Sequence, residues 1–359
     1  DPLTAKRIQI TKRGYPTATE AARARREAVE AADAGGAPAL AGSLTVGELL
    51  DLDLDGIDAD GVLGPKTRFD YRCSADAYVR PWLGRRRVRD LTPELALAWQ
   101  RQLLESGGTK AGQPLSPNSV RLARASLAGA LKLAVERGLL RANPLAVVPR
   151  PKPTRKVPRH WTPDEARSFL AGERGDRLYP LWAFLLGSGL RIGELVWLRW
   201  PNVDLDGERV RIVEFATALG WDLVASSGKS ATSVRTIDLD DGLVEVLRTQ
   251  RSTQMTEAAV AGYVDTDYVF SKAAGGPFHP QYLSRLLSRR SVLAGLPRLT
   301  AHGLRHTSAT LMLASGVPPK VAAERLGHAD PSLFMKLYSH VTPTMQRAAA
   351  DAIGAVLFG

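Results

Sequence analysis

Apolar residues recur at helical spacing through much of the first half of the chain. After Ser116-Pro117, the residues Val120, Leu127, Leu131 and Ala134 form one stripe, which predicts a long helix with one buried face. Similar patterns predict helices from about Thr19, from Thr45 through Leu50, over 67–79 and from Thr92. The acidic, glycine-containing stretch 51–65 lies between two of them and is predicted to be a loop.

The second half of the chain mixes helical and strand periodicities. Thr162-Pro163-Asp164-Glu165 has the spacing of a capping box, and residues 181–190 form an apolar helical pattern. Alternating or β-branched residues predict one small three-stranded sheet from 209–215, 219–226 and 234–239. Helical patterns then recur over 242–258, 280–293, 302–315, 318–326 and 331–338. The fold class is therefore mainly α with a small antiparallel β-sheet.

A basic, proline-rich segment, 149–160, separates the two halves. It contains four prolines and five Lys or Arg residues without an acid, and proline both stiffens the chain and removes backbone donors. We therefore expect a helical domain over 43–148, a linker over 149–160 and a second domain over 161–345. The apolar residues of 346–359, at helical spacing, predict a terminal tail helix.

Composition narrows the class of partner. The formal net charge is +11 and the pI is about 9.9, which favours a polyanion such as nucleic acid. Cys73 is the single cysteine, so disulfide frameworks and cysteine-based zinc sites are excluded and a reducing cytoplasm is expected. No apolar run reaches the roughly 20 residues of a membrane span, and no signal peptide is visible. Because the chain starts at Asp1 without Met, we expect further residues upstream.

Two residue pairs share a spacing that points to anion binding. Arg191 and Glu194 are three residues apart, as are His302 and Arg305, so each pair projects from one helix face. A guanidinium group at a helix start matches two phosphate oxygens, although Arg191 could equally be an ion-pair partner of Glu194. His302 and His306 have the spacing of a zinc pair, but Arg305 lies between them and no third ligand has suitable spacing, so no metal is expected.

Lys229 lies in Ser227-Gly228-Lys229-Ser230, which invites comparison with a nucleotide-binding loop. The earlier glycine of that motif is missing because position 223 is leucine, and a strand follows rather than a helix. We therefore expect no nucleotide cofactor and interpret Lys229 as a cation at a hairpin tip.

The order Arg191, Lys229, His302, Arg305, His328, Tyr338 resembles the tyrosine recombinase (phage integrase) family. The matching stretches are 188–195, Lys229 ahead of Arg235-Thr236-Ile237, 302–307, Leu326-Gly327-His328 and Tyr338-Ser339-His340. The resemblance is strong across 161–345, extends to a helical, SAM-like core-binding domain over 43–148, and includes a short arm-binding, AP2-like remnant within 1–42. It implies a mixed α/β catalytic domain that cleaves and rejoins DNA through a 3′-phosphotyrosyl bond.

The resemblance also implies a role for each residue. Tyr338 is the nucleophile, Arg191 and Arg305 bind the phosphate, His302 and His328 add hydrogen bonds, Lys229 protonates the leaving oxygen, and Glu194 supports Arg191 or a histidine. Neither metal nor another cofactor is implied. Candidate DNA contacts outside this set are Arg121, Arg124, Arg155, Lys156, Arg285 and Arg289.

The expected biology is integration or excision of a mobile element in a bacterial cytoplasm, at the nucleoid. Expected partners are double-stranded DNA with core and arm sites, a homotetramer on that DNA, a DNA-bending host factor and a directionality factor, but no membrane. A chromosome-dimer-resolving recombinase, a type IB topoisomerase-like enzyme and a DNA-binding protein without catalysis remain as alternatives.

Overall fold

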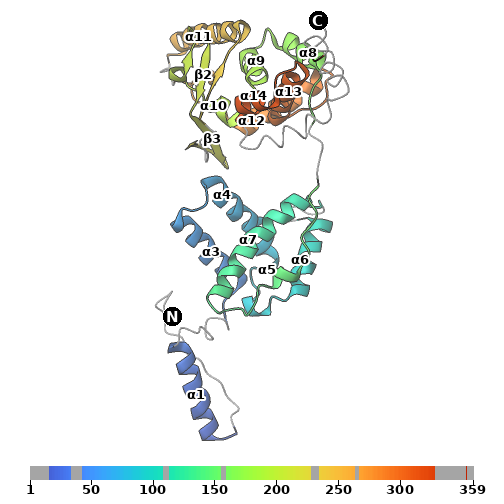
Figure 1. Cartoon of the computed structure of the whole chain (residues 1–359). Coiled ribbons are helices and arrows are strands. Elements are labelled where there is room, and N and C mark those ends of the chain that lie inside the picture. The colour runs from blue at the N-terminus through green and yellow to red at the C-terminus, as the bar shows by residue number, and fades with distance from the viewer. Residues whose placement is uncertain are drawn as a thin grey trace. The chain divides into compact units, whose positions relative to one another are not determined.

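The computed structural model describes residues 16–33, 43–107, 113–154, 159–227, 234–262, 267–327 and 353. The chain divides into two compact units, which we call the N-terminal unit, 1–156, and the C-terminal unit, 157–359. The division falls within the basic, proline-rich segment 149–160. Each unit is described by itself, and Figure 1 shows the elements of both.

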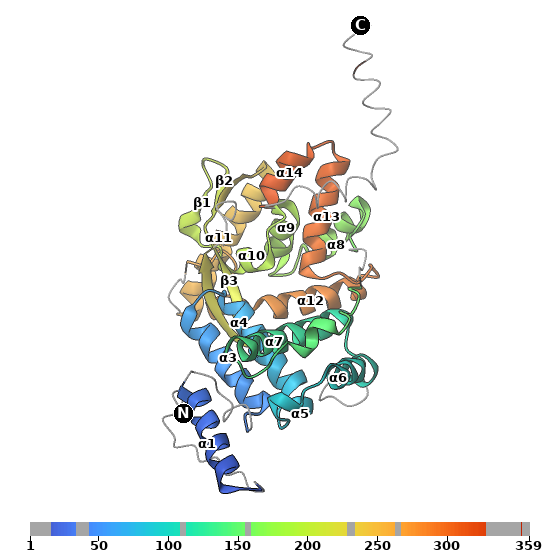
Figure 2. The same cartoon turned by 60° about the horizontal axis from the view of Figure 1, so that its bottom comes forward.

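The regular secondary structure described in the N-terminal unit is helical, apart from one isolated β-bridge between Thr45 and Arg87. Its helices are α1 (Ala18–Asp33), α3 (Val46–Asp60), α4 (Pro65–Ser74), α5 (Arg80–Leu83), α6 (Pro93–Ser106) and α7 (Pro117–Glu136), with a π-helical turn η1 (Ala75–Val79) and 3-10 turns η2 (Val88–Asp90) and η3 (Pro144–Val147). The predicted starts are confirmed, since Thr45, Thr92 and Ser116 accept N-cap hydrogen bonds. Helix α7 packs against α3, α4 and α6 (Figure 2), with Leu127 and Leu131 fully buried.

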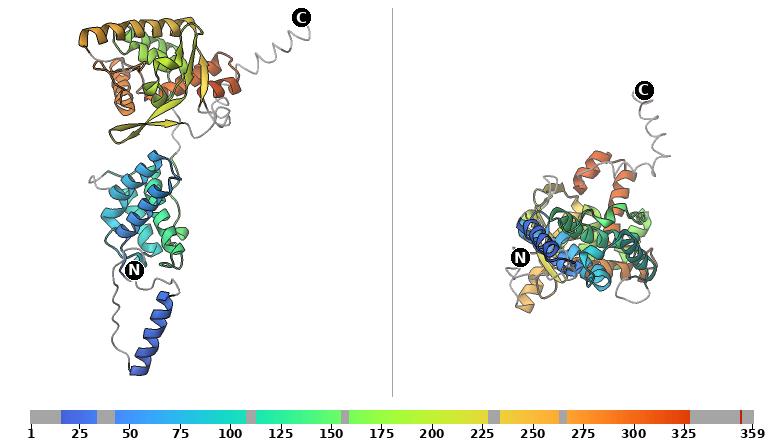
Figure 3. Two further views of the ribbon diagram at one scale, coloured as in Figure 1. Left: turned by 90° about the vertical axis from the view of Figure 1, so that its left-hand side faces the viewer. Right: turned by 90° about the horizontal axis from the view of Figure 1, so that it is seen from below.

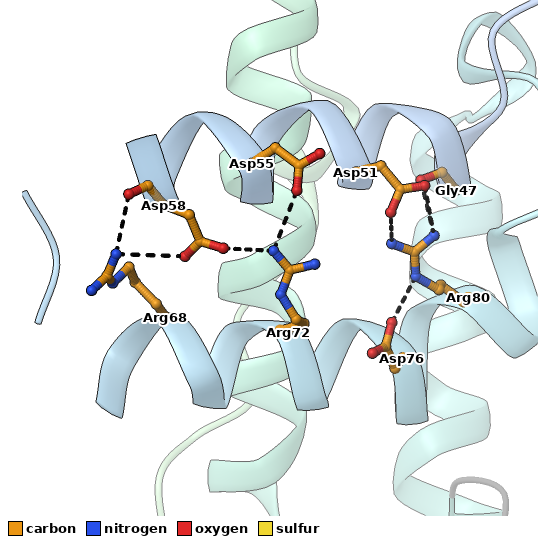
Figure 4. A network of polar contacts seen from close by, with 8 residues as sticks. All are labelled: Gly47, Asp51, Asp55, Asp58, Arg68, Arg72, Asp76 and Arg80. Carbon is orange, nitrogen blue, oxygen red and sulfur yellow. Dashed lines mark hydrogen bonds and ion pairs between the residues drawn. The ribbon is translucent and has the colours of Figure 1, made fainter. Parts of the chain in front are cut away.

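The prediction of a loop over 51–65 is wrong. Helix α3 continues through the acidic residues to Asp60 and ends at Gly61, whose φ of 63° is left-handed. Three of its aspartates, Asp51, Asp55 and Asp58, pair with arginines of the chain that follows, and Figure 4 shows these side chains pointing at one another. The closest ion-pair distances are Arg72–Asp58 at 2.7 Å, Arg80–Asp51 at 2.5 Å and Arg80–Asp76 at 2.7 Å. We call this set, with Asp55 and Arg68, the acidic ladder.

The C-terminal unit is built around an apolar helix. Its helices are α8 (Pro163–Glu173), α9 (Tyr179–Ser188), α10 (Ile192–Trp197), α11 (Asp241–Ala261), α12 (Pro280–Leu293), α13 (Ala301–Ala314) and α14 (Pro319–Leu326), with a 3-10 turn η4 (Trp200–Asn202). Thr162 and Glu165 form the predicted capping box. Helix α9 is buried almost all round and contacts α8, α11 and α13, with α11 lying along its outer side (Figure 3, left).

The strands form two sheets rather than the single three-stranded sheet that the sequence predicted. Strands β1 (Val203–Asp204), β2 (Arg209–Ile212) and β5 (Arg235–Asp238) pair in the antiparallel order β1-β2-β5. Strands β3 (Glu214–Leu219) and β4 (Asp222–Ser227) form a separate hairpin. Because β5 pairs with β2 and β4 with β3, the expected pairing of 219–226 with 234–239 is not found, and the hairpin of the described residues turns at Gly220-Trp221.

The fold class itself is confirmed as mainly helical with a small antiparallel sheet. No helix within the described part of the chain combines the length and the apolar composition that crossing a membrane requires.

Candidate active site

The start of α10 positions Arg191 and Glu194. Helix α9 ends at Gly189, which has a φ of 67°, and Arg191 is then the N-cap of α10. The Arg191 amide donates to Glu194 Oε2 at 2.9 Å, and Arg191 Nη1 donates to Oε1 at 2.8 Å. The Glu194 side chain is 4% exposed and that of Arg191 is 45% exposed. The arginine therefore keeps an open side while its partner carboxylate is buried.

Arg235 is a second partner of the same carboxylate. Its Nη1 and Nη2 donate to Glu194 Oε1 and Oε2 at 3.0 and 2.8 Å, and its side chain is 8% exposed. Burial opposes ionisation of Glu194, but Arg235 and Arg191 outweigh it and hold the pKa of the carboxyl below its ordinary value. Sequence reasoning missed this role. The available signal was the period of β5, which places Arg235 on the same face as buried Ile237.

Helix α13 brings in His302 and Arg305. Thr300 caps the helix by accepting from the Gly303 amide. Arg305 is 3% exposed, and burial, followed by the nearby charge of Arg191, lowers its pKa to about 9. His302, on the same face, has its pKa lowered by the surrounding protein and then by Arg305 and Arg191. The charges of Arg191 and Arg305 thus both lower the pKa of His302, and that of Arg191 lowers the pKa of Arg305.

The carboxyl end of α14 joins the three arginines. Arg235 Nε donates to the Arg325 carbonyl at 2.9 Å, Arg305 Nη2 to the Leu326 carbonyl at 2.6 Å, and Arg191 Nη2 to the Gly327 carbonyl at 2.7 Å. The last carbonyls of a helix lack partners within it and carry the negative end of its dipole, so cations stabilise them. Figure 2 shows α14 beside α13, with which it packs. We call Arg191, Arg235 and Arg305 with these carbonyls the arginine cluster.

The arginine cluster retains donors for a ligand. A guanidinium group has five N–H donors, and Arg191 and Arg305 each make two side-chain hydrogen bonds within the described structure. Two of the cluster's three positive charges remain after Glu194 is counted. A tetrahedral oxyanion, such as a phosphate group, is the ligand that best matches several guanidinium groups whose remaining N–H donors are available for hydrogen bonds.

His306 packs against His302 rather than joining the cluster. The two rings meet edge to face with centroids 4.5 Å apart. Burial, then His302 and Arg305, lowers the pKa of His306 to about 4, so this ring is neutral at pH 7. No group of three or more His, Cys, Asp or Glu residues suited to a metal occurs among the residues that the structure describes.

Several predicted site residues lie outside the described residues. They are Lys229, His328 and Tyr338, together with Arg155, Lys156, the predicted helix 331–338 and all of the tail 346–359 except Ile353. The described chain reaches Gly327, which ends α14 with a φ of 67°. His328 therefore follows directly on a residue held by Arg191.

The remaining DNA-contact candidates fall into two groups. Arg124 does not fit its prediction as a DNA contact: it is 7% exposed and donates to Gln100 and to the carbonyls of Leu145 and Val148. Those interior acceptors explain its burial and argue against contact with DNA. Arg121, Arg285 and Arg289 are exposed. Arg121 reaches the Pro151 carbonyl at 3.3 Å, while Arg285 and Arg289 form no ion pair within the described part of the chain.

Comparison with known proteins identifies the family that the chain resembles. The profile of the phage integrase family matches residues 162–345. A XerC-like tyrosine recombinase of Caldanaerobacter subterraneus is 28% identical over 241 residues, and the match spans 61% of this chain and 61% of that relative. The ICEBs1 integrase of Bacillus subtilis is 26% identical over 277 residues, covering 75% of this chain and 72% of that one.

Solved structures share the fold. The Tn1549 transposon integrase in complex with transposon right end DNA superposes with a TM-score of 0.69 at 21% identity, covering 87% of this chain and 100% of that one. A lambda integrase tetramer bound to a Holliday junction gives a TM-score of 0.59 at 21% identity, covering 93% and 90%. The family profile, which spans more than half of the chain, shows that this protein belongs to the phage integrase family, the tyrosine recombinases that break and rejoin DNA strands.

Proposed function

We propose that this chain is a site-specific recombinase of a mobile element, with Tyr338 as its nucleophile. The observation that carries the proposal is the arginine cluster. In it, the partly exposed Arg191 donates to the Gly327 carbonyl and the buried Arg305 donates to the Leu326 carbonyl, and His328 is the next residue in the sequence. Two cationic groups and His302 in one region support the binding of one backbone phosphate there, and His328 and Tyr338 follow Gly327 in the sequence.

The proposed reaction is a transesterification. The Tyr338 oxygen attacks the phosphorus, the bond from phosphorus to the 5′ oxygen breaks, and a 3′-phosphotyrosyl bond forms. The phenol has an ordinary pKa near ~10, so it must lose its proton as it attacks. Arg191 and Arg305 stabilise the charge that builds on the non-bridging oxygens, and Lys229 supplies a proton to the departing 5′ oxygen. The covalent bond retains the energy of the phosphodiester, so rejoining requires no nucleotide.

His302 and His328 complete the set. The lowered pKa of His302 keeps its ring neutral at pH 7, and a neutral imidazole can both accept and donate a proton. His302 is therefore the candidate for proton transfer to or from Tyr338, with His328 donating to a phosphate oxygen. Glu194 acts on Arg191 rather than on DNA because its carboxylate is buried and already shared by two arginines.

The partners are proposed from the relatives. One solved relative is a transposon integrase bound to transposon end DNA, and another is a tetramer bound to a Holliday junction. We therefore assign double-stranded DNA as the substrate and a homotetramer as the working assembly. Arm-site binding, a DNA-bending host protein and a directionality factor belong to the same proposal, with action at the nucleoid in the cytoplasm. The XerC-like relative keeps chromosome-dimer resolution as the competing assignment.

The test uses nicked suicide substrates drawn from DNA flanking the gene. The wild-type chain should form a covalent protein–DNA adduct, while Tyr338→Phe should bind the same DNA and form none. Tyr282→Phe is the matched control because Tyr282 is 53% exposed and its hydroxyl makes no hydrogen bond within the described structure. Adduct formation by Tyr338→Phe, or loss of the adduct in both variants, contradicts the assignment of the nucleophile.

A further inference from the structure

We propose that Arg235 is a positioning residue for the reaction: it holds Glu194, and with it Arg191, while fixing the carboxyl end of α14 from which His328 follows. This inference rests on the proposed function. It concerns a residue that the sequence analysis placed in a motif without a role, and it assigns that residue to the protein side of the site rather than to DNA.

The contacts of Arg235 are all made within the protein. Its Nε donates to the Arg325 carbonyl and its two terminal nitrogens donate to the two oxygens of Glu194, so each nitrogen has one acceptor. The side chain is 8% exposed, compared with 45% for Arg191. Arg191 therefore has an open side for a ligand, whereas the planar group of Arg235 is enclosed.

Strand β5 and helix α14 are joined by two reciprocal arginine contacts. Arg235, the first residue of β5, donates to the Arg325 carbonyl at 2.9 Å, and Arg325 Nη1 donates to the carbonyl of Asp238, the last residue of β5, at 2.8 Å. The strand is thus attached to the last turn of the helix at both of its ends. A shift of either contact would tilt α14 and move the residues that follow it.

Gly327 shows how closely Arg235 approaches the helix end. A Cβ at Gly327 would lie 2.8 Å from Nη1, 3.0 Å from Cζ and 3.1 Å from Nε of Arg235. The guanidinium group therefore covers the left-handed residue that ends α14, with Glu194 bound to its terminal nitrogens. Arg191 and Arg235 both donate to Glu194 and to the end of α14, but Arg235 binds both oxygens of Glu194 through its side chain and uses all three of its nitrogens in these contacts.

Arg235 also compensates the negative charge of the buried Glu194 carboxylate. A buried carboxylate needs compensation, and Arg191 alone would have to supply it if Arg235 were lost. Arg191 would then be drawn fully onto Glu194 and away from the phosphate position. A planar, bidentate partner is required because an ammonium group offers one point charge and cannot match both oxygens and a third acceptor at fixed angles.

The experiment compares Arg235→Gln and Arg235→Lys with the matched control Arg209→Gln. Arg209 lies in β2, next to β5, and pairs with Asp204 at 3.1 Å in an exposed position. Single-turnover cleavage of suicide DNA at saturation, the Kd for that DNA and hydrogen exchange at the amides of the last turn of α14 are measured for each. All comparisons use a temperature at which the variant is folded.

We expect Arg235→Gln to slow cleavage on the order of 10²-fold, as a displacement of about 1 Å of reacting groups does, with little change in Kd. Amide exchange at the end of α14 should accelerate. Arg235→Lys should recover part of the rate, and Arg209→Gln should match the wild type. If Arg235→Gln fails to fold, the test rests on Arg235→Lys. Slow cleavage by Arg235→Lys with an unchanged Kd for DNA then supports the inference.

Wild-type cleavage by the folded Arg235 variants, or unchanged exchange at the end of α14, overturns the inference. Failure of the proposed function gives a different pattern. In that case neither the wild type nor Arg209→Gln forms an adduct, while the exchange at α14 still responds to Arg235→Gln.

Discussion

In the acidic ladder, three arginines pair with four aspartates, whereas in the arginine cluster two of the three guanidinium groups bind the same carboxylate and Arg305 binds main-chain carbonyls. The ladder is exposed or partly exposed, and each of its arginines is paired with at least one carboxylate (Figure 4). The cluster is largely enclosed, and four of the acceptors of its arginines are main-chain carbonyls, which bind a cation without neutralising it. A carboxylate neutralises the charge of the arginine that it binds. An arginine that is bound only by carbonyls keeps its positive charge, which can then attract an anion.

The comparison is broken most directly by removing one arginine from each set. Arg191→Ala should slow cleavage of suicide DNA by roughly 10²–10³-fold, the usual effect of deleting one donor to a developing oxyanion. Arg72→Ala removes an arginine of the ladder and should leave cleavage unchanged, with a loss of no more than about 1 kcal/mol in unfolding free energy. Single-turnover kinetics and denaturant titration give the two values. Similar cleavage defects in both variants contradict the distinction.

Two glycines sharpen the comparison, because each ends a helix with a left-handed φ, 63° at Gly61 and 67° at Gly327. A Cβ at Gly61 would meet open space, so Gly61→Ala should cost about 1–2 kcal/mol from backbone strain alone. Gly327→Ala has the same strain and also pushes against Arg235. Thermal unfolding should show the larger loss for Gly327→Ala, and only that variant should cleave slowly. If both variants lose the same stability and Gly327→Ala cleaves DNA at the normal rate, the end of α14 does not affect the active site.

The pH dependence of stability should have opposite signs in the two units. Burial, then Glu136, raises the pKa of Asp53 to about 6, so the folded N-terminal unit prefers the protonated acid and loses stability as pH rises from about 4 to 6. The pKa of His306 is lowered to about 4, so the folded C-terminal unit prefers the neutral ring and loses stability as pH falls from 6.5 to about 4. Each effect should reach roughly 1–2 kcal/mol after solvent screening is allowed for.

Hydrogen exchange read separately in each unit between pH 4 and 6.5 measures this difference. Asp53→Asn should flatten the dependence of the N-terminal unit, and His306→Gln that of the C-terminal unit. A dependence that survives both substitutions must come from other groups.

The parts of the structure that the sequence predicted are those determined by neighbouring residues. The caps at Thr45, Ser116 and Thr162 and the pairing of Arg191 with Glu194 each depend on residues three positions apart. The prediction failed where distant residues decide. Helix α3 persists through its aspartates because arginines 10 to 29 residues away neutralise them.

The same reason explains the errors around Arg124 and the sheet. Arg124 is drawn inside by Gln100 and by carbonyls 21 and 24 residues further along. The strands looked like one sheet because alternation in sequence does not say which strand is the partner. The resemblance of the motifs to those of the tyrosine recombinase family pointed to Arg191, His302 and Arg305 as site residues. The role of Arg235 could be inferred only from its contacts in the structure.

The carbonyls of residues 325–327 have a consequence for how this region can change. A main-chain oxygen is supplied by every amino acid, so the contacts to Arg235, Arg305 and Arg191 do not depend on which side chains occupy Arg325 and Leu326. Replacing Leu326 tests packing, and replacing Arg325 removes its hydrogen bond to the Asp238 carbonyl, but neither change removes these acceptors. Chemical replacement of a backbone amide by an ester, which weakens the carbonyl as an acceptor, is the perturbation that addresses them.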